Sequence, residues 1–519
     1  MAQRRQKAVP SGPELFCTLV GAVGTDLEQV VTAVTHSFAA VRYSTKAFGT
    51  KETSIRLARL LHAISKYSEL PLSPVDDYIS SHMTAGDDFR AILGRDDAMA
   101  VLGLTQILKE RQDADKAGRL SNRIQPRRAY VLRSLKTPAE VITLREIYGS
   151  SCYVIAAYAP HQFRRDYLAK RIAETRSEFP VDRQFARAEA LIQRDQQEFD
   201  VKHGQNVRDT FHRADVFVDA SEPESLQKSI DRFVQLIFGN SFHTPTKDEY
   251  AMFHAHTAAI RSAELGRQVG AAIATREGDI VAVGTNEVPK AFGGLYWCDD
   301  KPDRREFQEG EDSNERHKRN VIADTIKHMK NAGWFSDAKN SLDVNELTAL
   351  ALANNAPALP RVSQIRNLIE FGRAVHAEMA ALTDAARRGV SVAGCTMYVT
   401  TFPCHMCARH VVSAGIARVI YIEPYARSLA AELYPDSIDV DTAEPGLHQV
   451  PFKPFVGVAP RQYLNLFTMT KRKTDDGKVL KFDPTSANLR YFQSPRVYLD
   501  NEDEQAALLK KLMKKKALI

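Results

Sequence analysis

The sequence lacks any run of about 18 apolar residues, the least that a membrane-spanning helix requires. Residues 1–16 are basic, and they contain no apolar stretch of the kind found in a secretion signal. These two absences lead us to expect a cytoplasmic protein with no membrane partner.

Cysteine is scarce, with six residues in a chain of 519. In a long chain without a secretion signal, such cysteines are expected to be reduced thiols, and the close pair Cys404 and Cys407 suggests a metal site before a disulfide.

The net charge of the chain is small as well. The formal net charge of +6 permits an anionic substrate but does not demand nucleic acid as a partner.

The chain is too long for one hydrophobic core, so two or three domains are expected. In residues 1–240, apolar strands alternate with helical segments: a strand leads into Gly21, a buried strand covers 152–157, and a short strand ends at Asp219. Strands separated by helices predict a parallel α/β sheet with right-handed crossovers.

A boundary is expected in residues 238–250, which are rich in Gly, Asn, Ser, Pro and Thr. We assign residues 241–475 to a second α/β domain, in which the strongly charged stretch 298–320 is expected to be a surface excursion. Residues 476–519 form a Lys-rich extension whose end, 501–519, is a candidate amphipathic helix. For its last basic stretch, 510–516, we expect a soluble, frayed tail, and contact with RNA or an acidic neighbour is the alternative.

Two short motifs in the second domain carry metal chemistry. Cys404 and Cys407 are three positions apart, so on the first turn of a helix their sulfurs converge, and the helix N-terminus favours thiolates. His376 supplies a third ligand, which leaves one tetrahedral position for water, as in catalytic zinc sites. Glu378 is two residues from the histidine and is expected to reach that water without binding the metal.

A closed structural site is the alternative to catalytic zinc. It requires a fourth ligand, for which Cys395 and His405 are the candidates in the sequence. His405 is better interpreted as a residue on the helix surface, and Cys395 as a small buried residue at the start of a strand. The spacing H-x-E followed by P-C-x-x-C is typical of the zinc nucleobase deaminases.

Three stretches resemble the deoxycytidylate deaminase branch of the cytidine deaminase-like fold: "RQVGAAIA", "VHAEMAAL" and "TTFPCHMCARHVVSAGIARVIYIE". The resemblance implies an α/β/α domain with a mixed sheet and both zinc-bearing helices on one face. It implies one catalytic Zn²⁺ held by His376, Cys404 and Cys407, and proton transfer by Glu378. It also implies that Asn286 contacts the sugar, although an Asn that satisfies its own turn is the alternative.

The wider chain, from about residue 15 to 470, is similar to the two-domain anti-phage dCTP deaminases of bacteria. That resemblance implies a P-loop kinase-like domain joined to the deaminase domain, a homo-oligomer, and depletion of deoxycytidine nucleotides during phage infection. Regulation by an RNA or a phage product is open, because no residue in the sequence indicates it.

We therefore expect hydrolytic deamination of free dCTP, dCMP or both to the uracil nucleotide and ammonia. One alternative is a housekeeping dCMP deaminase that supplies dTMP. Another is a polynucleotide-editing cytidine deaminase, which requires a long basic groove with interleaved aromatics. The small net charge and the aromatic content of 8% give that alternative little support.

Other polar residues in the second domain have two interpretations each. Ser262 and Arg267 are candidates for binding the substrate phosphates, or they belong to a solvated helix end. The stretch 293–300, "GGLYWCDD", has three interpretations. It could line the nucleotide pocket, it could hold a second metal through Cys298, or it could be a packed loop with a buried cysteine.

The loop after the first strand has the layout of a phosphate-binding loop. Gly21, Gly24 and Thr25 are its candidate nucleotide-binding residues. However, Leu27 and Glu28 stand where that motif has Lys and Ser or Thr, so phosphoryl transfer has lost its usual groups. Three functions stay open: an active kinase, a sensor of a regulatory nucleotide, or a structural and interaction role.

Overall fold

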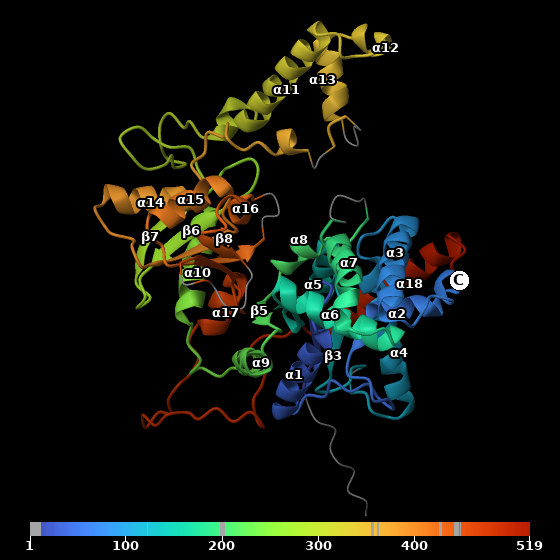
Figure 1. The fold of residues 1–519 in the computed structure, drawn as a ribbon. Helices are drawn as coiled ribbons and strands as arrows, with labels where there is room; N and C mark the ends of the chain where they lie inside the picture. Colours follow the sequence, from blue (N-terminus) through green and yellow to red (C-terminus); the bar gives the residue numbers. More distant parts are fainter. Residues whose placement is uncertain are drawn as a thin grey trace, which may run out of the picture. The chain divides into compact units, whose positions relative to one another are not determined.

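The computed structural model describes residues 12–121, 123–197, 203–353, 358–360, 363–424, 428–440, 446 and 448–519 (Figure 1). The basic start that we examined for a secretion signal lies, up to residue 11, outside the described residues. None of the helices in the described ranges is long and apolar enough to cross a membrane.

The chain forms two compact units. Unit 1 comprises residues 1–249, 441–444 and 454–519, and unit 2 comprises residues 250–440 and 445–453. In this division residues 454–519 belong to unit 1, whereas the expected domains 1–240, 241–475 and 476–519 place residues 454–475 in the second domain and the rest in a separate extension.

Unit 1 contains a six-stranded sheet. Every neighbouring pair of its strands is parallel except the pair β12 and β5, so the predicted parallel α/β sheet is confirmed. In spatial order, the strands are β12 (Gly457–Val458), β5 (Val216–Asp219), β4 (Cys152–Tyr158), β1 (Leu15–Gly21), β3 (Ala129–Arg133) and β2 (Ile55–Arg56).

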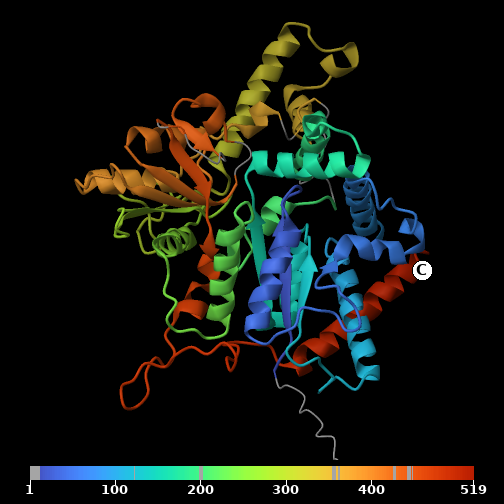
Figure 2. The same cartoon turned by 60° about the horizontal axis from the view of Figure 1, so that its bottom comes forward.

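Helices cover both faces of this sheet. On one face, α1 (Leu27–Ala40) and α9 (Pro223–Ile237) lie side by side, as Figure 2 shows, and share a buried core with alternate residues of β1. The other face carries α4 (Ala98–Lys116), α5 (Pro138–Tyr148) and α18 (Pro495–Lys515). The remaining helices of unit 1 are α2 (Leu57–Leu60), α3 (Val75–Leu93), α6 (His161–Arg176), α7 (Phe185–Gln197), α8 (Val207–Phe211) and α17 (Tyr463–Phe467).

The Lys-rich end of the chain packs into unit 1. Tyr498 on α18 is fully buried and contacts the ring of Phe16 on β1. Glu502, also fully buried, forms an ion pair with Arg111 on α4, and Arg111 donates two hydrogen bonds to Glu14. A charged cluster of this kind forms only when the helix is docked, so the candidate amphipathic helix is confirmed. The frayed tail expected for residues 510–516 is wrong, because α18 runs to Lys515 and Met513 is buried.

Unit 2 contains a mixed six-stranded sheet. In spatial order, its strands are β10 (Ile438–Val440), β11 (Val450–Pro454), β9 (Arg418–Glu423), β8 (Thr396–Thr401), β6 (Gly270–Ala274) and β7 (Ile280–Thr285). Strands β8 and β9 are parallel, whereas β6 is antiparallel to both β7 and β8. Its helices are α10 (Lys247–Ile260), α11 (Ser313–Asn331), α12 (Asp337–Asn340), α13 (Val344–Leu352), α14 (Ala377–Arg387), α15 (His405–Ser413) and α16 (Ala430–Leu433).

Unit 2 has three layers, as expected for an α/β/α domain. Helices α14 and α15 share one buried core with alternate residues of β6 and β8. A Cβ added at Gly270 on β6 would collide with the backbone of Ala255 on α10, and one added at Gly284 on β7 would collide with Ala377 on α14. The two glycines thus allow helices to approach the sheet closely on its opposite faces.

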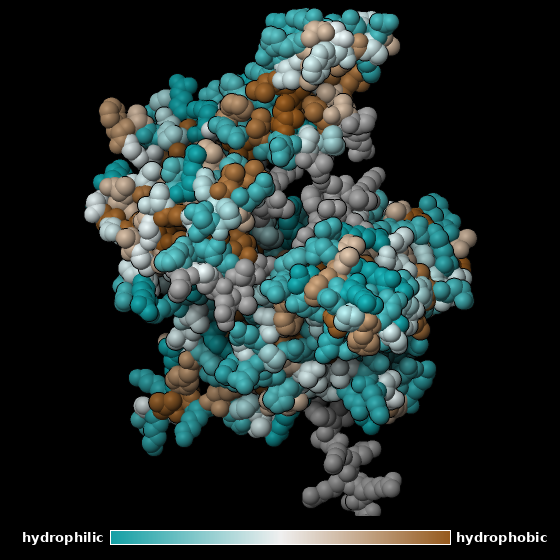
Figure 3. All heavy atoms as spheres, in the orientation of Figure 1, coloured by the Kyte–Doolittle hydropathy of each residue, from teal (hydrophilic) through white to brown (hydrophobic). Residues whose placement is uncertain are grey.

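Helices α11 and α13 form a small core of their own within unit 2. Figure 3 shows the apolar side chains gathered between these helices. The core members are Ile322, Ile326, Leu347 and Ala351. The charged stretch 298–320, expected to be a surface excursion, therefore leads into a helix with an apolar face.

Candidate metal centre

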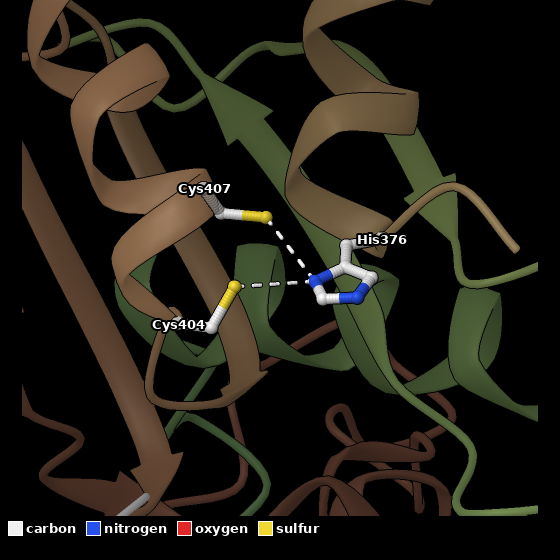
Figure 4. A group of neighbouring side chains, drawn as sticks. All are labelled: His376, Cys404 and Cys407. Atoms are coloured by element: carbon white, nitrogen blue, oxygen red, sulfur yellow. Dashed lines mark hydrogen bonds between the residues drawn. The ribbon is translucent and has the colours of Figure 1, made fainter. Parts of the chain in front are cut away.

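Three side chains of unit 2 converge on one point. His376 and Cys404 are the N-caps of α14 and α15, and Cys407 lies in the first turn of α15. The Nδ1 atom of His376 lies 3.3 Å from the sulfur of Cys404 and 3.4 Å from the sulfur of Cys407. Figure 4 shows that the three side chains point toward one another from the starts of the two helices.

The spacing of these atoms fits a tetrahedral zinc ion. With Zn–S of about 2.3 Å and Zn–N of about 2.0–2.1 Å, a tetrahedral site places nitrogen and sulfur about 3.6 Å apart. The two observed distances are close to that value, and the three ligand atoms all lie within 4.8 Å of one another. Two thiols and an imidazole are also the donor set that zinc prefers.

The charges within the cluster are arranged for a cation. A hydrogen bond from Cys407 lowers the pKa of Cys404 to about 4, and the pKa of Cys407 rises because its thiol keeps the shared proton. The Cys404 thiolate in turn hydrogen-bonds with His376 and raises the pKa of that imidazole to about 9. The position between the three side chains therefore attracts positive charge.

Neither candidate for a fourth ligand joins this cluster. Within the part of the chain that the structure describes, the only group of metal-ligating side chains consists of His376, Cys404 and Cys407. Cys395 is buried, just before β8, and His405 is the first residue of α15; neither belongs to the cluster. This arrangement fits a three-ligand site with an open position rather than a closed structural site.

Glu378 lies in the first turn of α14, directly beside the cluster. Its side chain is buried and forms a hydrogen bond with Cys407. Burial raises the pKa of this carboxyl to about 7, and the nearby His376 acts in the opposite direction. The structure thus brings together all four residues that the two motifs predicted.

The predicted substrate residues lie together at the start of β6 and the end of β7. The amide of Asn286 donates to the carbonyl of Arg267 and accepts from the backbone N–H of Val269, so it fixes the local backbone. The hydroxyl of Ser262 donates to the carbonyl of Asn286. Arg267 is half exposed and forms an ion pair of 3.4 Å with Glu423. Their roles toward a substrate stay predictions.

Glu423 is a residue that the motifs did not identify. It ends β9, and its backbone carbonyl accepts from the N–H of Phe402, which follows β8. Because β8 and β9 are parallel, their carboxyl ends meet at one edge of the sheet. An acidic residue that closes a buried strand is a sequence signal for a polar group at this edge of the sheet, but it does not identify Arg267 as the partner.

The stretch 293–300 lies at the surface of unit 2. Gly293, Gly294 and Trp297 line a hollow of about 890 Å³, and the guanidinium of Arg261 stacks 3.5 Å from the centroid of the Trp297 ring. Cys298 is exposed, so the expectation of a packed loop with a buried cysteine is wrong.

The candidate nucleotide-binding residues of unit 1 lie between β1 and α1. Gly21 is the last residue of β1, and Thr25 is buried. Gly24 has a φ of +88° and lies against Arg164 of α6, where an added Cβ would meet the Arg164 carbonyl at 2.7 Å. Glycine at this position therefore allows α6 to approach the loop.

The start of α1 is capped from within the chain. The Asp26 side chain accepts hydrogen bonds from the backbone N–H groups of Glu28 and Gln29. These are donors that a phosphate-binding loop offers to its ligand. A carboxylate already holds them here, so the loop differs from a working phosphate cradle.

Comparison with known proteins identifies the region that carries the cluster. Residues 245–423 match the family described as the cytidine and deoxycytidylate deaminase zinc-binding region. The deoxycytidylate deaminase of Enterobacteria phage T4 is 44% identical over 54 residues, which are 10% of this chain and 28% of that enzyme. The deoxycytidylate deaminase of Homo sapiens is 26% identical over 174 residues, which are 34% of this chain and 63% of that enzyme.

Among solved structures, the dCMP deaminase of cyanophage S-TIM5 in complex with dCMP and dUMP is 18% identical, with a TM-score of 0.22. The alignment covers 41% of this chain and 98% of that one. The chain thus spans less than a third of the phage T4 relative and 63% of the human one. The second half of the chain carries a cytidine and deoxycytidylate deaminase zinc-binding region, and most of unit 1 lies outside the match.

Proposed function

We propose that the zinc-binding region of unit 2 catalyses hydrolytic deamination of deoxycytidine nucleotides. The observation that supports this proposal most strongly is the three-ligand cluster with a buried carboxyl beside it. Three protein ligands leave one coordination position open, and the buried carboxyl of Glu378 contacts this cluster through Cys407. A zinc ion held by these residues would acidify a water molecule, the nucleophile that the hydrolysis needs.

The protein side chains hold and move charge in this reaction. His376, Cys404 and Cys407 would hold the ion at the starts of two helices. Glu378 takes a proton from water and delivers protons to N3 of the cytosine ring and to the departing amine. A C4–O bond forms, the C4–N bond breaks, and the products are the uracil nucleotide and ammonia.

Arg267 is the most suitable of the three predicted substrate residues for binding phosphate. Its guanidinium is half exposed, and its ion pair with Glu423 is long. Ser262 and Asn286 are buried and bonded to backbone groups, so we propose that they shape the sugar pocket by fixing the segment from residue 262 to 269.

The substrate is proposed to be dCTP, dCMP or both. The names of the curated relatives favour dCMP, whereas the similarity of the wider chain to two-domain anti-phage enzymes favours dCTP. We further propose that the protein acts as a homo-oligomer and depletes the deoxycytidine nucleotide pool during phage infection. A change in dCTP and dUTP levels in infected cells that carry the gene would support this role.

The activity is tested with purified protein and six substrates: dC, dCMP, dCTP, CMP, CTP and a cytosine oligonucleotide. Ammonia and the uracil product are measured for each. Turnover of dCMP or dCTP supports the proposal. The ratio of their kcat/KM values shows whether the preferred substrate carries one phosphate or three. Product from the oligonucleotide alone would instead assign the protein to polynucleotide editing.

A further inference from the structure

Unit 1 contains a hollow of about 220 Å³ next to the loop between β1 and α1. Aromatic and apolar side chains of α3 and α6 form part of its wall, among them Tyr78 and Tyr167. Its basic lining residues outnumber the acidic ones, which are Glu28 and Glu140. The basic ones are Arg56, Arg90, Arg133, Lys136 and Arg171.

Three arginines surround the carboxylate of Glu28. Arg56 and Arg133 form ion pairs with it, the latter at 2.7 Å. Although partial burial acts in the opposite direction, the charges of Arg133, Arg56 and Arg171 lower the pKa of Glu28. One carboxylate cannot neutralise three guanidinium groups, so positive charge is left for an anion from solution.

Four buried polar atoms in the wall lack a hydrogen-bond partner among the described residues: Nε of Arg56, Nη1 of Arg133, which is held only in its ion pair with Glu28, and two neutral oxygens. The neutral oxygens are the hydroxyl oxygen of Thr25, whose residue is 9% exposed, and the amide oxygen of Gln205, whose residue is 2% exposed. A buried polar atom without a partner is unfavourable, because it has lost its hydrogen bonds to water and gained none in the protein. Both residues line the hollow, so a polar ligand would satisfy groups that the protein leaves unbonded.

The backbone amides at the start of α1 do not supply the binding energy, because Asp26 occupies those of Glu28 and Gln29. The side chains of the hollow must therefore recognise the anion. Arginine is suited to this task, since its planar guanidinium binds phosphate through two parallel hydrogen bonds.

We propose that unit 1 binds a small phosphorylated ligand of the nucleoside monophosphate class, with its phosphate between Arg56, Arg133 and Arg171. The ring of the ligand lies against the aromatic wall. The hollow is smaller than the range of about 300–1,000 Å³ found for drug-sized ligands, which favours a monophosphate over a triphosphate. The ligand is bound without phosphoryl transfer, since Leu27 and Glu28 replace the groups that transfer requires.

Calorimetry on the full chain tests this site, with inorganic phosphate, dTMP, dAMP and thymidine as probes. None of these probes carries a cytosine, so the result does not depend on deamination in unit 2. We expect saturable binding of a nucleoside monophosphate at one site per chain, and binding of thymidine at least about tenfold weaker than that of dTMP. No saturable binding of any phosphorylated probe at millimolar concentration would overturn the proposal.

Substitutions assign the binding to the hollow. Arg171 is exposed at its rim, so R171Q is expected to fold and to weaken monophosphate binding at least about tenfold, the effect of losing a charge-assisted hydrogen bond. R183Q is the matched control, because Arg183 is an exposed arginine of unit 1 outside the hollow. E28Q is expected to tighten binding, since it removes the carboxylate that competes for the same arginines. Unchanged affinity in both R171Q and R56Q would overturn the proposal.

Discussion

The Nδ1 atom of His376 lies 3.3 Å from the sulfur of Cys404, although 28 positions separate the two residues in the sequence. Each residue is the N-cap of its helix, and both helices pack on the same face of the unit 2 sheet. The metal centre is therefore built where two helix N-termini meet, and their dipoles stabilise thiolate ligands.

The first prediction concerns the metal content. The protein is expected to bind about one zinc ion per chain, and C404S is expected to lose it because two ligands hold zinc far more weakly than three. Elemental analysis of the purified wild type and of purified C404S measures the zinc content of each. C395S is the matched control, since Cys395 is a buried cysteine of the same unit outside the cluster. Zinc retained at full occupancy in C404S would contradict the ligand assignment.

The second prediction separates catalysis from metal binding. E378Q keeps the size of the side chain but removes its acid–base function, so turnover is expected to fall by about 10²–10⁴-fold. The zinc content is expected to stay at the wild-type level. Ammonia release and elemental analysis on the same preparation give the two values. D384N makes the same change of charge on α14, where Asp384 pairs with Arg387 and Arg388, and it is expected to remain active. Normal turnover by E378Q would remove Glu378 from the mechanism.

The sequence predicted the metal cluster because its signal is local. Cys404 and Cys407 are three positions apart, and the stretch from His376 to Cys404 encodes a helix and a strand with clear apolar patterns. The spacing of donor atoms along a helix follows from helix geometry alone. The strands β4, β5, β8 and β9 were predictable for a similar reason, since each is a short apolar run.

Contacts between distant residues were not predictable in this way. Glu28 pairs with Arg56 and Arg133, and nothing near any of the three indicates the other two. The Lys-rich composition of residues 510–516 suggested a solvated tail, whereas the buried side chains Tyr498 and Glu502 decide the packing of α18. Average composition is thus a poor guide when a few residues on one face carry the contacts.

The third prediction concerns the docking of α18. Glu502 is fully buried and pairs with Arg111, so E502A leaves part of a buried positive charge uncompensated. We expect the free energy of unfolding to fall by about 3 kcal/mol, the lower end for breaking a buried ion pair, because Glu14 still contacts Arg111. Urea unfolding measures the change. E504A, at an exposed position of the same helix, is the control and is expected to change stability little. Equal stability of E502A and the wild type would show that the pair does not hold α18.

The fourth prediction tests whether Arg267 binds the substrate phosphate. If its guanidinium contacts a phosphate, R267Q removes a charge-assisted hydrogen bond, and kcat/KM for dCMP should fall by about 10–150-fold. The nucleoside deoxycytidine has no phosphate, so its kcat/KM should change little. The difference between the two substrates matters more than either value, because damage to the fold or to the metal centre would lower both alike. R409Q provides the matched control, since Arg409 is an exposed arginine on the zinc-bearing helix α15. An equal loss for nucleotide and nucleoside in R267Q would instead indicate that Arg267 acts on the backbone through its pair with Glu423.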